Sequence, residues 1–241
     1  MKALLLRVGI DSGYGSLSPV FEDFSYEYIP IYYKNKKEPE TKEKRTYFDI
    51  KCFSKKAENK SISSYVPLQI QNKVIHLDPE FDTFTYGDPT MIKRLALLKL
   101  KENDLLVFYL GGVQINNQSQ PEKGVYIFGY FTVRKIYDWN NLNPKEKKEL
   151  TEKSLYNNAH LRSSKSQQNL VIVEGDHKKS KQLQHCIKIS SINTKGKNPP
   201  YLASEKMKNL LNIRDSIVRS VPLWIQDEPY ISNLKKLLNI S

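Results

Sequence analysis

The feature that most constrains the fold is a pair of long β-type runs in the middle of the chain. Leu105–Leu110 is uninterrupted apolar sequence, and Gly124–Tyr137 is the longest β-type stretch. A run that is apolar at every position is typical of a strand covered on both faces. Gly129, inside the second run, predicts a bulge or a close approach by another segment. The sequence therefore predicts a sheet built around these two strands.

An apolar run near the N-terminus, beginning at Leu4, leads into a turn that contains Gly9, Gly13 and Gly15. Glycine permits positive φ and lets a ligand approach bare amides, so this turn is a candidate anion-binding loop. Its spacing matches neither the dinucleotide G-x-G-x-x-G motif nor the lysine-ended P-loop, so neither a dinucleotide fold nor an NTPase is indicated. A tight turn without a ligand is the alternative interpretation.

The remaining segments predict an α+β or mostly β protein. Strands are expected at 24–33, 47–53, 65–70, 74–77, 169–173 and 186–189, the last two as a hairpin, and helices at 90–101, 144–152, 202–213 and 229–240. Asp88-Pro89 predicts a helix N-cap followed by proline, and Asn143-Pro144 predicts another. We expect one domain over residues 1–200, with a lysine-rich insertion at about 34–64, and a C-terminal helical extension over 201–241.

The charge of the chain predicts a polyanionic partner, DNA or RNA. The net charge is +12, and residues 161–241 hold 14 Lys and Arg against 6 Asp and Glu. Phosphate contacts are expected from a basic stripe, and base stacking from tyrosines. The expected residues are Arg162, Lys165, Lys178, Lys179, Lys181, Lys195 and Lys197, with Tyr126, Tyr130 and Tyr201. The alternative is a solvated lysine surface over core tyrosines.

Hydropathy and cysteine content restrict the protein class further. No apolar run reaches membrane-spanning length, and Met1 leads directly into a short strand, so we expect a cytoplasmic protein without signal peptide or anchor. Cys52 and Cys186 lie far apart and lack the C-x-x-C pairing of zinc ribbons and redox motifs. Both are expected to be ordinary buried thiols.

Polar residues at strand ends and in loops are the candidate site. They are Arg7, Asp11, Ser12, His76, Asp78, Asp88 and His160. Arginine inside an apolar strand requires a partner, either a carboxylate of the protein or a phosphate gripped by two hydrogen bonds. Asp11 and Ser12 either read a base or sugar or cap their own turn.

Three of these candidates carry catalytic alternatives. His76 with Asp78 is a candidate general acid and base pair, although a structural hydrogen bond needs no catalysis. His76, Asp78 and His160 match the composition of a two-histidine, one-carboxylate metal site, but nothing else in the sequence calls for a metal. We therefore predict neither a metal nor another cofactor, and leave open whether the protein is an enzyme.

Several motifs recur together in one known family. They are Arg7-x-Gly9-Ile10-Asp11-Ser12, Ser18-Pro19, Ile29-Pro30-Ile31, the His76-Leu77-Asp78-Pro79 box, Asp104-Leu105-x-x-Phe108, Phe128-Gly129-Tyr130, His160 and Asn169–Ile172. In this combination the chain resembles, over roughly residues 1 to 190, the third type of nucleotide modification associated domain. It departs from the family pattern at Gly111-Gly112, where an aromatic-rich strand end is usual. The resemblance implies a role around modified or processed nucleic acid.

The strands around Phe108 and Phe128 are also similar to the closing strands of PUA and EVE-type barrels, which hold a base or RNA end. The expected fold is thus a mixed, strongly bent sheet or a PUA/EVE-like barrel, decorated by helices. The expected function is to bind nucleic acid and recognise a base or phosphate in a polar pocket. The alternatives are an enzyme that modifies nucleotides or cleaves nucleic acid through His76, Asp78 and Asp11, and an accessory subunit whose C-terminal helix docks on a partner protein.

Overall fold

The computed structural model describes residues 1–34, 42–116, 121–163, 167–191, 201–214 and 216–240. The strands are β1 Ala3–Val8, β2 Ser18–Val20, β3 Ile31–Tyr32, β4 Ile75–His76, β5 Thr85–Asp88, β6 Leu105–Gln114, β7 Lys123–Asp138, β8 Val171–Gly175, β9 Lys181–Lys188, β10 Ser190–Ser191, β11 Tyr201–Ala203, β12 Ser216–Ile217 and β13 Leu223–Ile225. The α-helices are α1 Met91–Leu97, α2 Pro144–Glu152, α3 Ala159–Arg162, α4 Glu205–Leu211 and α5 Glu228–Leu238. Short 3-10 helices span Ser12–Tyr14, Lys55–Ala57, Ile62–Tyr65, Leu68–Ile70 and Trp139–Asn141.

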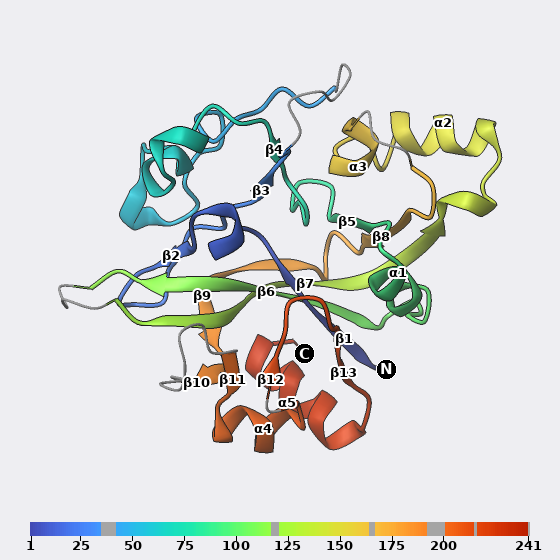
Figure 1. The fold of residues 1–241 in the computed structure, drawn as a ribbon. Coiled ribbons are helices and arrows are strands. Elements are labelled where there is room, and N and C mark those ends of the chain that lie inside the picture. The colour runs from blue at the N-terminus through green and yellow to red at the C-terminus, as the bar shows by residue number, and fades with distance from the viewer. Residues whose placement is uncertain (35–41, 117–120, 164–166, 192–200, 215, 241) are drawn as a thin grey trace.

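The centre of the molecule is a mixed eight-stranded sheet in the order β13-β1-β6-β7-β8-β5 (Figure 1). Strand β2 also pairs with β6, and β9 also pairs with β7. The β1–β6 and β2–β6 pairs are parallel, and the other pairs in this sheet are antiparallel. The sheet is open, because its order ends on β13 and β5. The α+β prediction with a mixed sheet is confirmed, whereas a closed PUA/EVE-like barrel is not found.

Both faces of the central strands are covered, which explains their unbroken apolar sequence. Leu4 and Leu6 of β1 pack into one hydrophobic cluster with Phe108, and Leu5 packs into another with Val107 on the opposite face. Figure 1 shows α4 and α5 below the sheet, and the segments around β3 and β4 above it. The alternation of side chains along β1 therefore serves two cores.

Strand β7 is divided by the bulge that Gly129 predicts. Its first half pairs with β9 and its second half with β8, with register shifts between Ile127 and Gly129 and between Val133 and Lys135. A Cβ at Gly129 would lie 2.6 Å from the ring of Phe81, so another segment does approach closely here. This division also explains why the predicted β8–β9 hairpin is wrong: each strand pairs with its own half of β7.

The region before β5 differs most from expectation. Residues 47–53 and 65–70 were predicted to be strands, but the described residues there form 3-10 turns and isolated bridges around Tyr47. Of the expected strand at 24–33, only β3 forms a strand, and Phe24 at its start takes a positive φ of 63°. Short apolar runs do not distinguish strands from buried turns, and the local hydrogen bonds of Ser54, Ser61 and Ser63 favour turns here.

The C-terminal segment contributes to the main sheet and to one core. The expected helices α4 and α5 are present, and the segment between them contains β13, which pairs antiparallel with β1. The apolar side of α5, formed by Ile231, Leu234 and Leu238, is buried in this chain's own core. The boundary at residue 200 and the docking of α5 on a partner protein stay predictions. None of the helices in the described residues has the length and apolarity needed to cross a membrane.

Candidate functional site

A pocket of about 400 Å³ opens where β1 ends. Its walls come from the end of β1, from β3, β4 and β5, from the start of α1, from α3, and from the loop between β12 and β13. Five of the seven polar residues singled out in the sequence line it, namely Arg7, His76, Asp78, Asp88 and His160. The glycine turn and the histidine-aspartate corner therefore meet in one recess, although they lie almost seventy positions apart.

Arg7 is the last but one residue of β1 and is 8% exposed. Its Nε is buried without a hydrogen-bond partner, and no carboxylate in the described residues forms an ion pair with its guanidinium. The guanidinium lies 5.1 Å from the ring centroid of Tyr201. Burial lowers the pKa of Arg7, because desolvation penalises the charged form. Arg7 is thus a buried cation whose charge the described part of the protein leaves without a direct counterion.

The neighbouring strand leaves room for this side chain. A Cβ at Gly111, on β6, would lie only 2.6 Å from Nη2 of Arg7. The absence of a side chain at Gly111 therefore leaves the space that the guanidinium of Arg7 occupies. An aromatic residue at position 111 would occupy the space that Arg7 fills.

A second arginine reaches the pocket from the C-terminal part of the chain. Nη1 of Arg219 lies 2.7 Å from Oδ2 of Asp11, in an ion pair. Asp11 also accepts a hydrogen bond of 3.0 Å from the amide of Gly13, so it caps its own turn as the alternative interpretation stated. Ser12 is exposed and does not line the pocket.

His76, Asp78 and His160 form a compact cluster on one wall. Oδ2 of Asp78 lies 3.2 Å from Nε2 of His160 and 3.8 Å from Nε2 of His76. The two imidazole ring centroids are 4.6 Å apart. Burial raises the pKa of Asp78 to about 6, against the opposing effect of the hydrogen bond from His160.

Neighbouring groups hold each member of this cluster in place. The Tyr33 hydroxyl lies 2.8 Å from Nδ1 of His76, and the Gly87 amide donates to the carboxylate of Asp78. Asn158 accepts from the amide of His160 at 3.1 Å and donates to Oγ1 of Thr85 at 3.1 Å. The short helix α3, and with it His160, is therefore tied to β5.

The lining of the pocket carries further charges. Asp88 accepts from the Thr90 amide and pairs with Lys93 at 3.0 Å; burial opposes ionisation of Asp88, but Lys93 and Thr90 together lower its pKa. Thr90, rather than Asp88, is the N-cap residue of α1. Nζ of Lys34 lies 4.0 Å from the ring centroid of Tyr14. The lining thus combines the cations of Arg7, Arg219, Lys34 and Lys93 with the carboxylates of Asp78 and Asp88.

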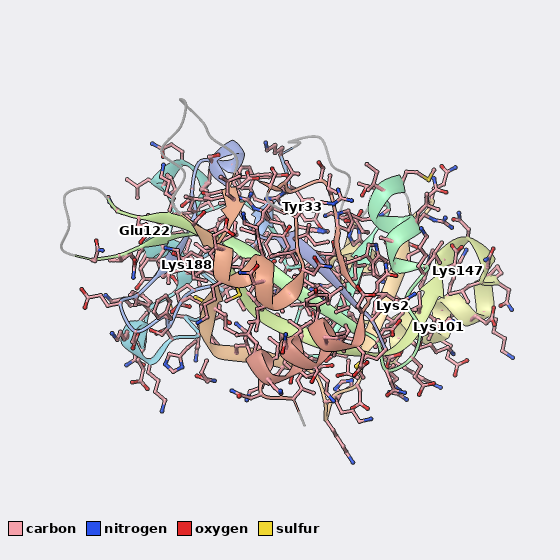
Figure 2. All side chains as sticks on the ribbon, turned by 90° about the horizontal axis from the view of Figure 1, so that it is seen from below. Lys2, Tyr33, Lys101, Glu122, Lys147 and Lys188 are labelled. Atoms are coloured by element: carbon pink, nitrogen blue, oxygen red, sulfur yellow. The ribbon has the colours of Figure 1, made fainter. Side chains whose placement is uncertain are left out.

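The predicted basic stripe lies elsewhere. Arg162 pairs with Glu43 at 3.0 Å, while Lys178 and Lys179 lie in the turn between β8 and β9 and Lys181 begins β9. None of these four residues lines the pocket. Figure 2 labels a further basic residue, Lys188 at the end of β9, which pairs with Glu122. Lys165, Lys195 and Lys197 lie outside the described residues. A nucleic-acid contact by the stripe stays a prediction.

The three tyrosines expected to stack on bases do not line the pocket either. Tyr126 and Tyr130 are 0% and 5% exposed and belong to the hydrophobic clusters, so the core alternative applies to them. Tyr201 lies half-buried beside Arg7. The tyrosines that line the pocket are Tyr14, Tyr32, Tyr33 and Tyr86. Sequence reasoning did not assign any of these four to the site.

Comparison with known proteins supplies the family. No curated protein and no solved structure matches the chain significantly. The family model for nucleotide modification associated domain 3 matches residues 2–224, which include every residue described above as lining the pocket. Since this match spans most of the 241 residues, the chain belongs to the nucleotide modification associated domain 3 family and has a role associated with nucleotide modification.

Proposed function

We propose that the protein binds a nucleotide unit of DNA or RNA in this pocket, with the phosphate at Arg7. The observation that carries the proposal is the buried guanidinium of Arg7, which has no direct counterion among the described residues. An unpaired buried charge is costly, and a phosphate offers it two parallel hydrogen bonds. Arg219 lines the same pocket, but its charge is already compensated by Asp11. It therefore adds positive potential to the pocket without requiring a ligand as a counterion.

The rest of the lining suits a base. Tyr14 and Tyr32 are half-buried and line the pocket, and their rings meet edge to face at 5.3 Å, so they supply aromatic surface to its wall. Stacking on an aromatic ring is worth about 1–3 kcal/mol per base and tolerates any base. Asp88 and His76 add hydrogen-bonding groups that can discriminate between base edges. A volume of about 400 Å³ lies within the range of small-ligand pockets.

Binding of labelled oligonucleotides and of single nucleoside monophosphates tests this proposal. We expect measurable affinity for both at low salt, with the oligonucleotide affinity falling steeply as salt increases, because phosphate contacts release counterions. Fluorescence anisotropy measures binding of the labelled oligonucleotides, and calorimetry measures binding of the nucleoside monophosphates. Thr90 lines the pocket and is exposed, so Thr90→Trp is a substitution that can obstruct the recess. Unchanged oligonucleotide affinity in folded Thr90→Trp protein would place recognition outside this pocket.

A smaller change beside Arg7 gives a finer test. Gly111→Ala puts a methyl carbon 2.6 Å from the present position of Nη2 of Arg7, so the end of that flexible side chain must shift. We expect a change of less than about 1 kcal/mol in the free energy of unfolding, because only the end of a side chain has to move. We expect at least a threefold loss of nucleoside monophosphate affinity. Urea denaturation measures the stability, and calorimetry on the same preparation measures the affinity. Unchanged affinity would argue against a phosphate at Arg7.

A second candidate function is an enzyme that modifies the bound nucleotide. The cluster of His76, Asp78 and His160 favours it, since a carboxylate beside two imidazoles is a common acid and base arrangement. Asp11, expected to act with them, is instead paired with Arg219. Mass spectrometry of incubated oligonucleotides separates the candidates: a mass change lost in His76→Ala and Asp78→Ala supports the enzyme, and binding without turnover supports recognition.

A further inference from the structure

We infer that His76, Asp78 and His160 bind a divalent first-row transition metal ion, such as Zn²⁺, Mn²⁺ or Fe²⁺, at the wall of the pocket. The inference does not rest on the proposed nucleotide binding, because the observation that carries that proposal is the buried guanidinium of Arg7, which does not belong to this cluster. It reverses the expectation, stated in the sequence analysis, that the protein binds no metal, and the reason is geometric. The structure brings together three ligand types that lie scattered along the chain.

The spacing of the three ligand atoms carries the inference. One nitrogen of each histidine and one oxygen of Asp78 all lie within 4.8 Å of one another. Ligand atoms around tetrahedral zinc are about 3.3 Å apart, given metal–ligand distances of about 2.0–2.1 Å. The Asp78–His160 and Asp78–His76 distances of 3.2 Å and 3.8 Å bracket that value. Small side-chain adjustments therefore suffice to place all three around one ion.

The surrounding groups orient these atoms as they do in metal sites. Metal-bound histidine usually hydrogen-bonds through its other ring nitrogen, and the Tyr33 hydroxyl occupies that position on His76. The amide of Gly87 donates to Asp78 and fixes the carboxylate. A Cβ at Gly87 would lie 2.8 Å from the ring of His160, so this glycine also leaves space for the imidazole.

The composition and position of the cluster restrict which metal ions it can bind. Two imidazoles and one carboxylate without a thiolate suit zinc, iron or manganese, and neither Cys52 nor Cys186 lines the pocket. All three ligands face the pocket, so an ion held by them keeps coordination positions open to water or to a phosphate oxygen. Such an ion would share a recess with Arg7, which makes the pocket more favourable for an anion.

Metal titration of the untagged protein tests the inference, with Co²⁺ as a spectroscopic probe and Zn²⁺ by calorimetry. The remaining two of the four histidines, His177 and His185, are exposed, so the background protein is the His177→Ala, His185→Ala double variant. We expect one ion per chain in this background. His160→Ala and Asp78→Asn should each weaken binding at least about 100-fold, because loss of an outer-shell partner alone costs about 10–100-fold. Tyr33→Phe should weaken it about 10-fold.

Two measurements keep the test decisive. X-ray absorption of the Zn²⁺-loaded background protein should show two imidazole nitrogens and oxygen ligands with no sulfur, and it requires no ligand variant to fold. The Arg7→Met variant should bind Co²⁺ normally even if nucleotide binding is lost, so the two proposals can fail separately. Either of two results would overturn the inference: no stoichiometric binding of Co²⁺ and Zn²⁺, or binding by folded His160→Ala as tight as that of the background protein. The cluster would then be only a hydrogen-bonded network of histidine and aspartate.

Discussion

Arg7→Met is expected to lower the affinity for a nucleoside monophosphate at least about 100-fold, which corresponds to about 2.8 kcal/mol. Arg7 is the buried cation at the end of β1, and the substitution removes both hydrogen bonds that a guanidinium offers a phosphate. Hydrogen bonds to charged groups contribute about 1.5–3 kcal/mol each, so the estimate is a modest one. Arg7→Lys should retain part of the affinity, because lysine keeps the charge but not the planar fork. Calorimetry with the three proteins measures the series.

The same substitution should leave the free energy of unfolding unchanged or increase it. Methionine has a similar reach and replaces an unpaired buried charge by an apolar side chain, which is often neutral or stabilising. The matched control is Arg214→Met at an exposed arginine, which should change neither quantity. If Arg7→Met instead destabilised the protein by several kcal/mol, Arg7 would be a structural residue and the phosphate would have to bind elsewhere.

Glu43→Ala is expected to destabilise the protein by about 3 kcal/mol, the lower end of the range for breaking a buried ion pair. The Glu43 side chain is 0% exposed and pairs with Arg45 at 2.7 Å and with Arg162 at 3.0 Å. Arg162 is the last residue of α3, the helix that carries His160. Loss of Glu43 should therefore loosen the histidine wall of the pocket as well as lower stability. Urea denaturation measures the loss of stability.

The pH dependence of this effect has a definite sign. Burial opposes ionisation of Glu43, but the hydrogen bonds of Arg45 outweigh it and the pKa lies below the ordinary value. A lowered pKa contributes stability above the unfolded-state pKa and loses it as the pH falls through the folded-state pKa. The difference in the free energy of unfolding between wild type and Glu43→Ala should thus reach its full size at pH 7 and decrease as the pH falls into the acid range. Glu58→Ala, at an exposed glutamate, should stay within about 0.5 kcal/mol throughout.

Much of the sheet could be predicted because its signal is local. β6 and β7 are marked by apolar runs, and α2 by Asn143 and Pro144, whose expected cap is a full capping box in the structure. Pairing is less predictable, because it depends on where a strand bends. The bulge near Gly129 was expected, but nothing in the sequence shows that it sends β8 and β9 to different halves of β7.

The candidate site could be predicted in part, for a related reason. Arg7, His76 and Asp78 stand at the ends of strands, and the family motifs single them out, so their presence in the pocket was foreseeable. Arg219 was not, because it lies in a short loop between two strands that the hydropathy pattern does not reveal. Tyr33 was not either, since a tyrosine in an aromatic-rich stretch gives no indication that its hydroxyl meets His76. Partners distant in sequence become visible only in the fold.

The pairing of β13 with β1 has a consequence for the chain as a whole. β1 is apolar at nearly every position, and β13 covers the edge of it that β6 leaves bare. An uncovered strand of this composition would present its amides and carbonyls to any other extended chain. This edge of β1 is therefore covered by a strand that lies more than two hundred positions later in the chain. During synthesis β1 keeps an unpaired edge until β13 has been made.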